Sequence, residues 1–297
     1  MDKSTKGPTD PRPQGPAPEF PQEPIEPPGS IDEMTPEADH GETTYRGLNR
    51  LTGRRALITG GDSGIGRATA IAYAREGADV LISYLPEEAS DAEDTCRYIE
   101  QAGRRAVAVP GDIQDEALCD KLVDMAFSEL GGLDILVNNA AYQVTHDSIA
   151  DYTNDEIDRA FRTNVYAMFW LCRAALPRMV PGSVIINTAS IQAFDPSAQL
   201  LAYAATKAAI VNFTKALSEM AMKQGVRVNA IAPGPVWTPL IPSTMPEDHV
   251  ATFGSNTSYQ RPAQPVEIAP VYVFLASEEA RYVTGEVYGV TGGRTPY

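Results

Sequence analysis

A short apolar strand that runs directly into a glycine-rich turn constrains the fold of this chain more than any other feature. The strand spans residues 55–59, and the turn reads Gly60-Gly61-Asp62-Ser63-Gly64-Ile65-Gly66. Gly60 allows a sharp reversal, Gly64 lets the backbone approach a pyrophosphate, and Gly66 lets the next helix pack closely on the strand. The first amides of that helix would then face phosphates. The spacing is G-x-x-x-G-x-G, so the turn alone is weak evidence for a dinucleotide site.

The rest of the chain repeats the same order of strand, turn and helix. We expect strands at 55–59, 78–84, 105–109, 133–137, 183–187, 226–232 and 286–290, and helices at 65–76, 91–102, 116–130, 153–179, 203–223 and 266–276. Strands separated by helices form right-handed βαβ units. Residues 47–297 are therefore predicted to form a single Rossmann-like doubly wound α/β domain, with a parallel sheet covered by helices on both faces.

Residues 1–46 differ in composition from everything that follows. Proline prevents regular helices and strand ladders, and it favours an extended polyproline conformation. We expect an extended or disordered arm, loosely packed or clasping a neighbouring subunit. The prolines lie at positions 8, 11, 13, 16, 18, 21, 24, 27 and 28.

Charge and composition exclude several classes of partner. A net charge of −15 and a pI near 4.6 disfavour nucleic acid and anionic membranes, which the protein's field would repel. Cys96, Cys119 and Cys172 show no C-x-x-C spacing, and His249 has no neighbouring second ligand, so neither disulfides nor a metal site are predicted. Without an apolar leader or a run of 18 apolar residues, the sequence predicts a cytoplasmic protein.

Tyr203 and Lys207 are four residues apart on an expected helix, so their side chains share one face. A phenol is a weak acid, but a neighbouring ammonium would favour its ionised form and lower its pKa. Ser190 follows the apolar run 184–187 and could hold a carbonyl or alcohol oxygen beside them. The three residues together predict an acid–base site, although Tyr-x-x-x-Lys alone also occurs by chance.

Together these motifs resemble the short-chain dehydrogenase/reductase family, over residues 51–293. Thr59 to Gly66 match its T-G-x-x-x-G-x-G cofactor turn, and Ser190, Tyr203 and Lys207 match its catalytic triad. Asn164 matches the fourth catalytic residue. Three further segments match. Asp112 corresponds to the acid that contacts adenine, and Asn138-Asn139-Ala140 corresponds to the N-N-A-G segment, with Ala141 in place of its usual glycine. Pro233-Gly234-Pro235-Val236-Trp237-Thr238 resembles the stretch beside the nicotinamide.

The resemblance implies hydride transfer between a nicotinamide cofactor and a carbonyl or alcohol. Tyr203 would exchange the proton, Lys207 would lower the pKa of the phenol and hold the ribose, Ser190 would fix the substrate oxygen, and Asn164 would place a water in a proton relay. It also implies a homotetramer. The implied cofactor contacts are Gly60, Asp62, Ser63, Gly64, Ile65, Gly66, Ser83, Tyr84, Asp112, Ile113, Asn139, Ala140, Tyr203, Lys207, Pro233, Gly234, Val236 and Thr238.

Cofactor and substrate choice stay open at this point. An NAD-selective member usually carries an aspartate at the end of the second strand, where Ser83 or Tyr84 stands here, so NADP is slightly favoured over NAD. An aldehyde or ketone reductase is the main prediction. The alternatives are an alcohol or sugar dehydrogenase working in the oxidative direction and, more remotely, a non-catalytic nucleotide sensor. Specificity is expected from Gln143, Gln192, Phe194 and a mobile lid at 239–261.

Overall fold

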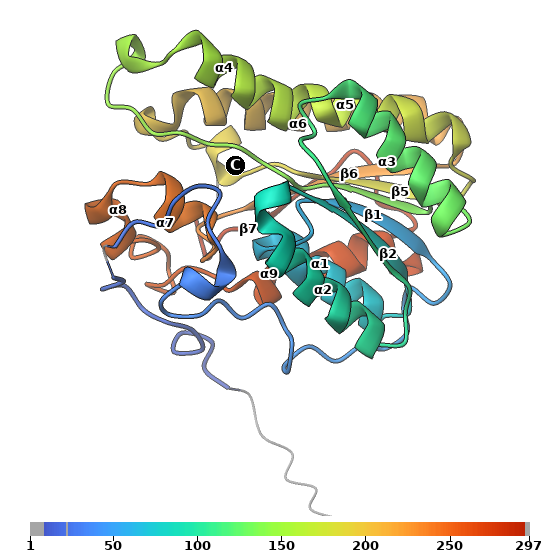
Figure 1. The fold of residues 1–297 in the computed structure, drawn as a ribbon, viewed down its shortest axis with the longest axis horizontal. Helices are drawn as coiled ribbons and strands as arrows, with labels where there is room; N and C mark the ends of the chain where they lie inside the picture. The colour runs from blue at the N-terminus through green and yellow to red at the C-terminus, as the bar shows by residue number, and fades with distance from the viewer. Residues whose placement is uncertain (1–8, 22, 295–297) are drawn as a thin grey trace, which may run out of the picture.

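A seven-stranded parallel sheet forms the centre of the computed structural model, which describes residues 9–21 and 23–294. The strand order is β3-β2-β1-β4-β5-β6-β7 (Figure 1). This is a Rossmann-like doubly wound sheet, as predicted. The strands are β1 Arg55–Thr59, β2 Asp79–Tyr84, β3 Ala106–Pro110, β4 Ile135–Asn138, β5 Val184–Thr188, β6 Arg227–Pro233 and β7 Val287–Val290.

Helices cover both faces of the sheet (Figure 1). One layer holds α1 Gly64–Arg75, α2 Ala89–Gln101 and α9 Pro265–Ala276. The opposite layer holds α3 Glu116–Glu129, α4 Asn154–Phe161, α5 Ala167–Ala175 and α6 Leu201–Met222. Two short helices, α7 Leu240–Thr244 and α8 Glu247–Ala251, lie at one side of this sandwich. Single 3₁₀ turns occur at Ile31–Glu33, Pro86–Glu88, Ile149–Asp151, Leu176–Arg178, Ile191–Ala193, Ala198–Leu200 and Glu278–Ala280.

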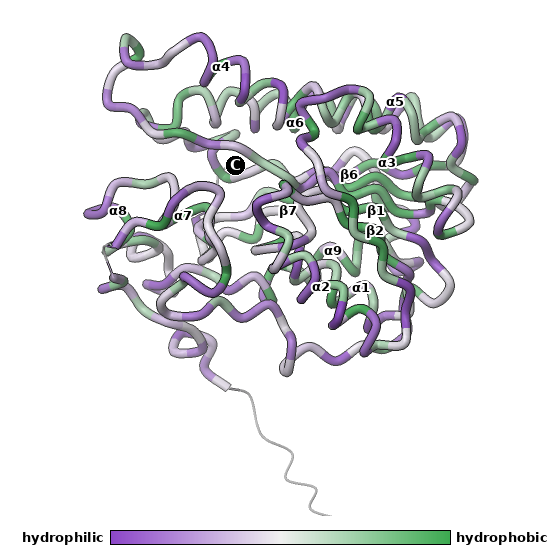
Figure 2. Tube along the Cα trace, in the orientation of Figure 1, coloured by the Kyte–Doolittle hydropathy of each residue, from purple (hydrophilic) through white to green (hydrophobic). Residues whose placement is uncertain are grey.

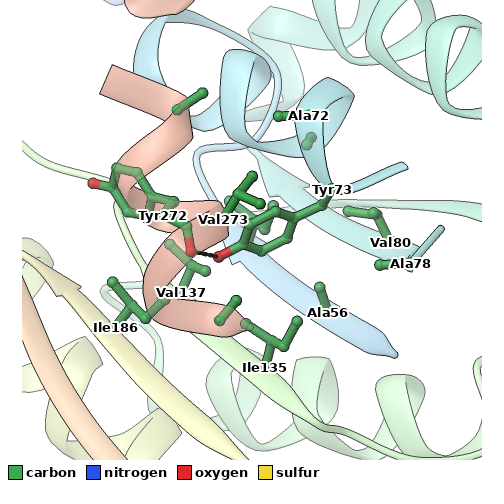
Figure 3. Packing of buried hydrophobic residues seen from close by; sticks show 14 of the residues in the cluster. Ala56, Ala72, Tyr73, Ala78, Val80, Ile135, Val137, Ile186, Tyr272 and Val273 are labelled. Carbon is green, nitrogen blue, oxygen red and sulfur yellow. Dashed lines mark hydrogen bonds between the residues drawn. The ribbon is translucent and has the colours of Figure 1, made fainter. Parts of the chain in front are cut away.

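The strands are almost continuously apolar because both of their faces are buried. Figure 2 shows hydrophobic residues concentrated in the central strands and hydrophilic ones on the outer surfaces. Between α1 and α9, the fully buried Tyr73 ring packs against Val80, Ile135 and neighbouring side chains (Figure 3). Its hydroxyl donates to the carbonyl of Tyr272 over 3.2 Å, so the buried polar atom has a partner.

The long helix expected at 153–179 is interrupted. The Thr153/Glu156 capping box is present, but residues Arg162–Tyr166 form a π-helical turn between α4 and α5. Asn164 lies in this turn. A π-helical turn holds one residue more than an α-helical turn, and the hydrogen bonds of the Asn164 side chain to Tyr142 and Thr206 favour it. The periodicity of apolar residues along the sequence does not reveal such a turn.

The N-terminal arm has little regular structure, and within residues 9–21 and 23–46 a few of its side chains pack against the rest of the chain. Phe20 and Met34 are each only 3% exposed, and they pack with Trp237, Ile241 and Val250 of the same chain. Burial of these apolar side chains compensates for the missing ladder hydrogen bonds. Figure 1 shows the arm running beneath α7 and α8. Within the described ranges, no helix combines the length and hydropathy needed to cross a membrane.

Candidate active site

The carboxyl ends of β1, β4 and β5 meet at one edge of the sheet, where ligands bind in folds of this type. Asn139, just after β4, donates its side-chain amide to the carbonyls of Thr59 and Gly60, over 3.1 and 3.0 Å. Thr59 Oγ1 in turn accepts from the backbone amides of Asn139 and Ala140. These four bonds fix the glycine turn against the next strand.

The glycines of this turn leave no room for side chains. A Cβ at Gly66 would lie 1.8 Å from the carbonyl oxygen of Gly60, which shows how closely α1 packs on the turn. Gly60 and Gly64 both have positive φ values, 61° and 49°. A Cβ at Gly64 would meet the Thr238 methyl at 3.0 Å, so the turn and the segment after β6 are in contact. The open backbone and the free first-turn amides of α1 fit a pyrophosphate.

Ser190, Tyr203 and Lys207 lie together at the same edge. Ser190 follows β5, whereas Tyr203 and Lys207 come from α6. A side-chain hydrogen bond joins Tyr203 to Ser190, and Lys207 Nζ is 5.2 Å from the Tyr203 ring centroid. Lys207 is 1% exposed, and its Nζ donates to the Thr188 carbonyl over 2.7 Å. The structure therefore brings a phenol, an amine and a hydroxyl together, with Ser190 and Lys207 buried and Tyr203 half-buried.

Burial controls the proton affinities of this cluster. It raises the pKa of Tyr203 to about 12, against the smaller opposite effect of the Ser190 hydrogen bond. It lowers the pKa of Lys207 to about 7. Desolvation disfavours the charged forms of both groups, and the lysine is bonded to the Thr188 carbonyl, so the lowering of the phenol pKa by Lys207 stays a prediction.

Asn164, in the π-helical turn, connects the cluster to the loop after β4. Its Oδ1 accepts from the Tyr142 amide over 2.8 Å, and its Nδ2 donates to the Tyr142 carbonyl and to Thr206 Oγ1. Thr206 is the residue before Lys207. Asn164 is thus bonded to the residue that precedes Lys207, and its three hydrogen bonds hold the side-chain amide in a single orientation.

The comparisons with known proteins agree with this geometry. A family model described as enoyl-(acyl carrier protein) reductase matches residues 60–295. The uncharacterized oxidoreductase YghA of Escherichia coli is 52% identical over 276 residues, with 93% of this chain and 94% of that protein covered. The chain belongs to the short-chain dehydrogenase/reductase family. It is an NAD(P)-dependent oxidoreductase that acts on small-molecule substrates.

Other relatives in the family carry more specific names. The glucose and ribitol dehydrogenase of Daucus carota is 43% identical, with 92% of this chain and 96% of that protein covered. The chloroplastic NADPH-dependent aldehyde reductase 1 of Arabidopsis thaliana is 41% identical, with 90% and 94% covered. A short-chain dehydrogenase from Burkholderia cenocepacia J2315, solved in complex with NADP, is 35% identical with a TM-score of 0.77, and the match covers 82% of this chain and 98% of that one.

The remaining predicted cofactor contacts lie along the same edge. Ser83 and Tyr84 end β2, and Gly234 forms a backbone bond to Val290 of the last strand. Val236 forms a β-bridge with Ala263. Asp112 is bonded to Gln114 through both carboxylate oxygens, so it is tied to its own loop in this structure. The buried Ile113 and the half-buried Ala140 and Ile65 lie close by, whereas Pro233 ends β6.

Sequence reasoning listed Asp62 among the cofactor contacts but did not predict that it forms an acidic group with Glu88 behind the glycine turn. Asp62 is 1% exposed, and among the described residues it forms no ion pair; hydrogen bonds from its own backbone amide and from Ser63 oppose the effect of burial only in part. Burial is the main cause that raises the pKa of Asp62 to about 6 and that of Glu88 to about 8, and repulsion from Asp62 contributes to the shift of Glu88. Arg67 cannot neutralise them fully, because its guanidinium is bonded to Glu42 and Asp94. The sequence signal that could have indicated this acidic group is the pair of glutamates, Glu87 and Glu88, that follows β2.

The expected lid at 239–261 contains helices α7 and α8, and Thr244 bonds it to the loop after β4. Gln143 Nε2 donates to Thr244 Oγ1 over 2.7 Å, and Thr145 Oγ1 donates to the Thr244 carbonyl. Gln143 is thus bonded to the segment, and its role in substrate specificity stays a prediction. Gln192 accepts from the Ser197 amide, and Phe194 follows the same 3₁₀ turn. Among described residues, no cluster of three metal-ligating side chains occurs.

Proposed function

We propose that this protein is an NADP(H)-dependent reductase of small aldehydes or ketones, with Ser190, Tyr203 and Lys207 as its catalytic residues. The observation that carries the proposal is the convergence of these three side chains beside a glycine turn in which a Cβ has no room. Such a turn at a helix N-terminus suits a pyrophosphate, and the half-buried phenol beside Ser190 suits proton transfer.

When bound, the nicotinamide supplies the hydride. The Tyr203 hydroxyl, protonated throughout the physiological range because its pKa is near 12, would donate its proton to the substrate oxygen. The Ser190 hydroxyl would hold that oxygen in place. Lys207, bonded here to the Thr188 carbonyl, would hold the ribose hydroxyls and return a proton toward Tyr203. In oxidation the same residues would act in the reverse direction.

Asn164 would position a water between Lys207 and solvent. Three hydrogen bonds fix its amide beside Thr206, so its orientation is set before the cofactor binds. The glycine turn and the segment from Pro233 to Thr238 would hold the rest of the cofactor, with Thr238 in contact with Gly64.

Two observations favour NADP over NAD. No carboxylate ends β2, where Ser83 and Tyr84 stand, so the residues that usually bind a ribose 2′-hydroxyl are missing. The Arabidopsis relative is named as NADPH-dependent, and the Burkholderia structure holds NADP. Glu88 lies after the strand, but its pKa near 8 leaves it largely uncharged at neutral pH, so its repulsion of a 2′-phosphate is weak.

A second function is favoured by the Daucus relative, which is named as a glucose and ribitol dehydrogenase. The same site would then oxidise a sugar or alcohol. Titration with NADPH and NADH separates the two when it is followed by two assays: reduction of aldehydes and ketones with the reduced cofactor, and oxidation of sugars with NADP⁺ or NAD⁺. Tight NADPH binding with aldehyde reduction supports the reductase. Tight NADH binding with sugar oxidation supports the dehydrogenase. Cofactor binding without turnover of any carbonyl or sugar supports the remote alternative, a nucleotide sensor.

We further propose a cytoplasmic homotetramer assembled through the α4–α6 layer and the last strand. Large apolar side chains are exposed on this layer: Phe169 is 51% exposed and Met220 is 64% exposed. Such a surface favours association between copies of the chain. Light scattering of the purified protein tests the assembly, since a monomer would contradict it. The boundary between arm and domain near residue 46 stays a prediction.

A further inference from the structure

The N-terminal arm is bonded to both walls of the proposed site. On the cofactor side, the Asp39 amide donates to Gln264 Oε1 over 2.8 Å, and Glu42 forms an ion pair with Arg67 of α1. Arg75 of α1 donates to the carbonyls of Gly41 and Tyr45. This half of the arm is therefore fixed to the helix that follows the glycine turn.

The other half of the arm covers the substrate side. Phe20 stacks on Trp237, with ring centroids 4.1 Å apart and an interplanar angle of 14°. The Trp237 indole N–H donates to the Pro36 carbonyl over 2.8 Å. The Glu19 amide donates to the Ala251 carbonyl at the end of α8 over 2.8 Å. The arm thus crosses the segment that contains α7 and α8 and binds it at several points.

Trp237 lies between two residues of the proposed nicotinamide contact, Val236 and Thr238. It is 1% exposed, and the cluster that buries it combines arm residues with residues of the α7 and α8 segment, not residues of the sheet. A cavity of about 300 Å³, lined in part by Ile25, Met34 and Trp237, lies between the arm and this segment. Because packing is incomplete there, the position of Trp237 depends on a few strong contacts, chiefly the Phe20 ring and the Pro36 carbonyl.

We infer that the arm is an intramolecular strap that positions residues 236–253 against the active site, with Phe20 and Trp237 as its positioning residues. The strap acts on the substrate wall, because α7 is also bonded to Gln143 through Thr244. The expected effect of the strap on turnover rests on the proposed function. Its expected effect on the rigidity of residues 236–253 does not. Loosening the strap should weaken carbonyl binding while leaving the cofactor turn intact, since the turn is held separately by Asn139.

The test compares the full-length protein with Phe20→Ala, with Phe20→Tyr, which keeps a ring, and with Glu26→Ala, an exposed arm control. In Phe20→Ala we expect amide exchange at residues 236–253 to accelerate at least about tenfold, with α6 unchanged. The KM for an aldehyde should rise about tenfold while the Kd for NADPH rises much less, by about threefold at most, because only Val236 and Thr238 of the loosened segment would contact the cofactor. Phe20→Tyr should restore both values, and Glu26→Ala should match the unaltered protein.

Unchanged exchange at residues 236–253 in Phe20→Ala overturns the strap, and so does faster exchange with an unchanged aldehyde KM. A raised NADPH Kd equal to the change in KM would also overturn it, because the arm would then act on the cofactor side. If the unaltered protein reduces no carbonyl, the proposed function fails instead, and the exchange measurement alone decides whether the arm restrains the segment.

Discussion

Lys207 donates its ammonium to the backbone carbonyl of Thr188 over 2.7 Å, from a position with 1% exposure. A main-chain acceptor gives the lysine one partner but no counter-charge, so desolvation dominates and its pKa falls to about 7. The lysine beside the proposed acid is therefore close to half-protonated at neutral pH. It can gain or lose a proton at little cost, which is what a proton relay requires.

The first prediction concerns pH. Lys207 is charged below its pKa of about 7 and neutral above it, so the attraction for the anionic cofactor is lost as pH rises. We expect kcat/KM for NADPH, which reports the free enzyme, to fall about tenfold per pH unit above pH 7. Lys207→Arg keeps its charge and should flatten the profile. A rate that is constant or rising from pH 6 to 9 in the unaltered protein would contradict this.

The second prediction concerns Asn164. Asn164→Ala removes three hydrogen bonds and leaves the Tyr142 amide without its acceptor, so the free energy of unfolding should fall by about 2 kcal/mol. The exposed Asn154→Ala, at the start of α4, should change it by less than about 0.5 kcal/mol. Urea unfolding measures both. Equal stabilities for the two variants would show that the π-helical turn does not depend on this side chain.

A third prediction tests the glycine turn. In Gly66→Ala the new Cβ would collide with the Gly60 carbonyl oxygen, so the turn must move and NADPH should bind at least about 100-fold more weakly. Gly182→Ala is the control: φ is +90° there, but nothing lies within 4 Å of the new atom. It should cost about 1 kcal/mol of stability and leave the NADPH Kd unchanged. Unimpaired NADPH binding in Gly66→Ala would exclude the turn from the cofactor site.

The fourth prediction concerns the acidic group. The folded-state pKa of Glu88 is about 8, above its usual value, so its contribution to stability is present at low pH and is lost as pH rises through 8. Glu88→Gln cannot ionise. After allowance for screening by water, it should be more stable than the unaltered protein by about 1 kcal/mol at pH 9, with no difference at pH 4.

The control for Glu88 is the exposed neighbour Glu87, replaced in the same way. Glu87→Gln should change stability little at either pH, because its carboxylate is hydrated. Thermal unfolding at the two pH values is the measurement. A Glu88→Gln protein that is less stable than the unaltered protein at pH 9 would mean that the ionised carboxylate stabilises the fold.

The sequence alone was enough to predict the parallel sheet. Apolar strands that alternate with helices along the chain leave few arrangements in which both faces of the sheet are covered. The predicted strands agree with β1 to β7 within two residues at each end. It also identified Ser190, Tyr203 and Lys207, because their spacing on one strand end and one helix is local information.

Other features depend on contacts between distant residues. The stacking of Phe20 on Trp237 joins residues that are more than 200 positions apart in the sequence. The proline content of the arm, from which a loose arm was predicted, gives no information about this contact. The partner of Lys207 is a backbone carbonyl, which has no sequence signature. The upward shift of the Tyr203 pKa follows from burial, and this depends on the complete packing around α6.

The most direct test of the account is Tyr203→Phe, which removes one hydroxyl and keeps the ring. We expect the Kd for NADPH to stay within about threefold and kcat for aldehyde reduction to fall by about a thousandfold or more, because only the proton donor is lost. Tyr282→Phe, at a fully exposed position, should keep full activity. Turnover of Tyr203→Phe near that of the unaltered protein would contradict the proposed mechanism.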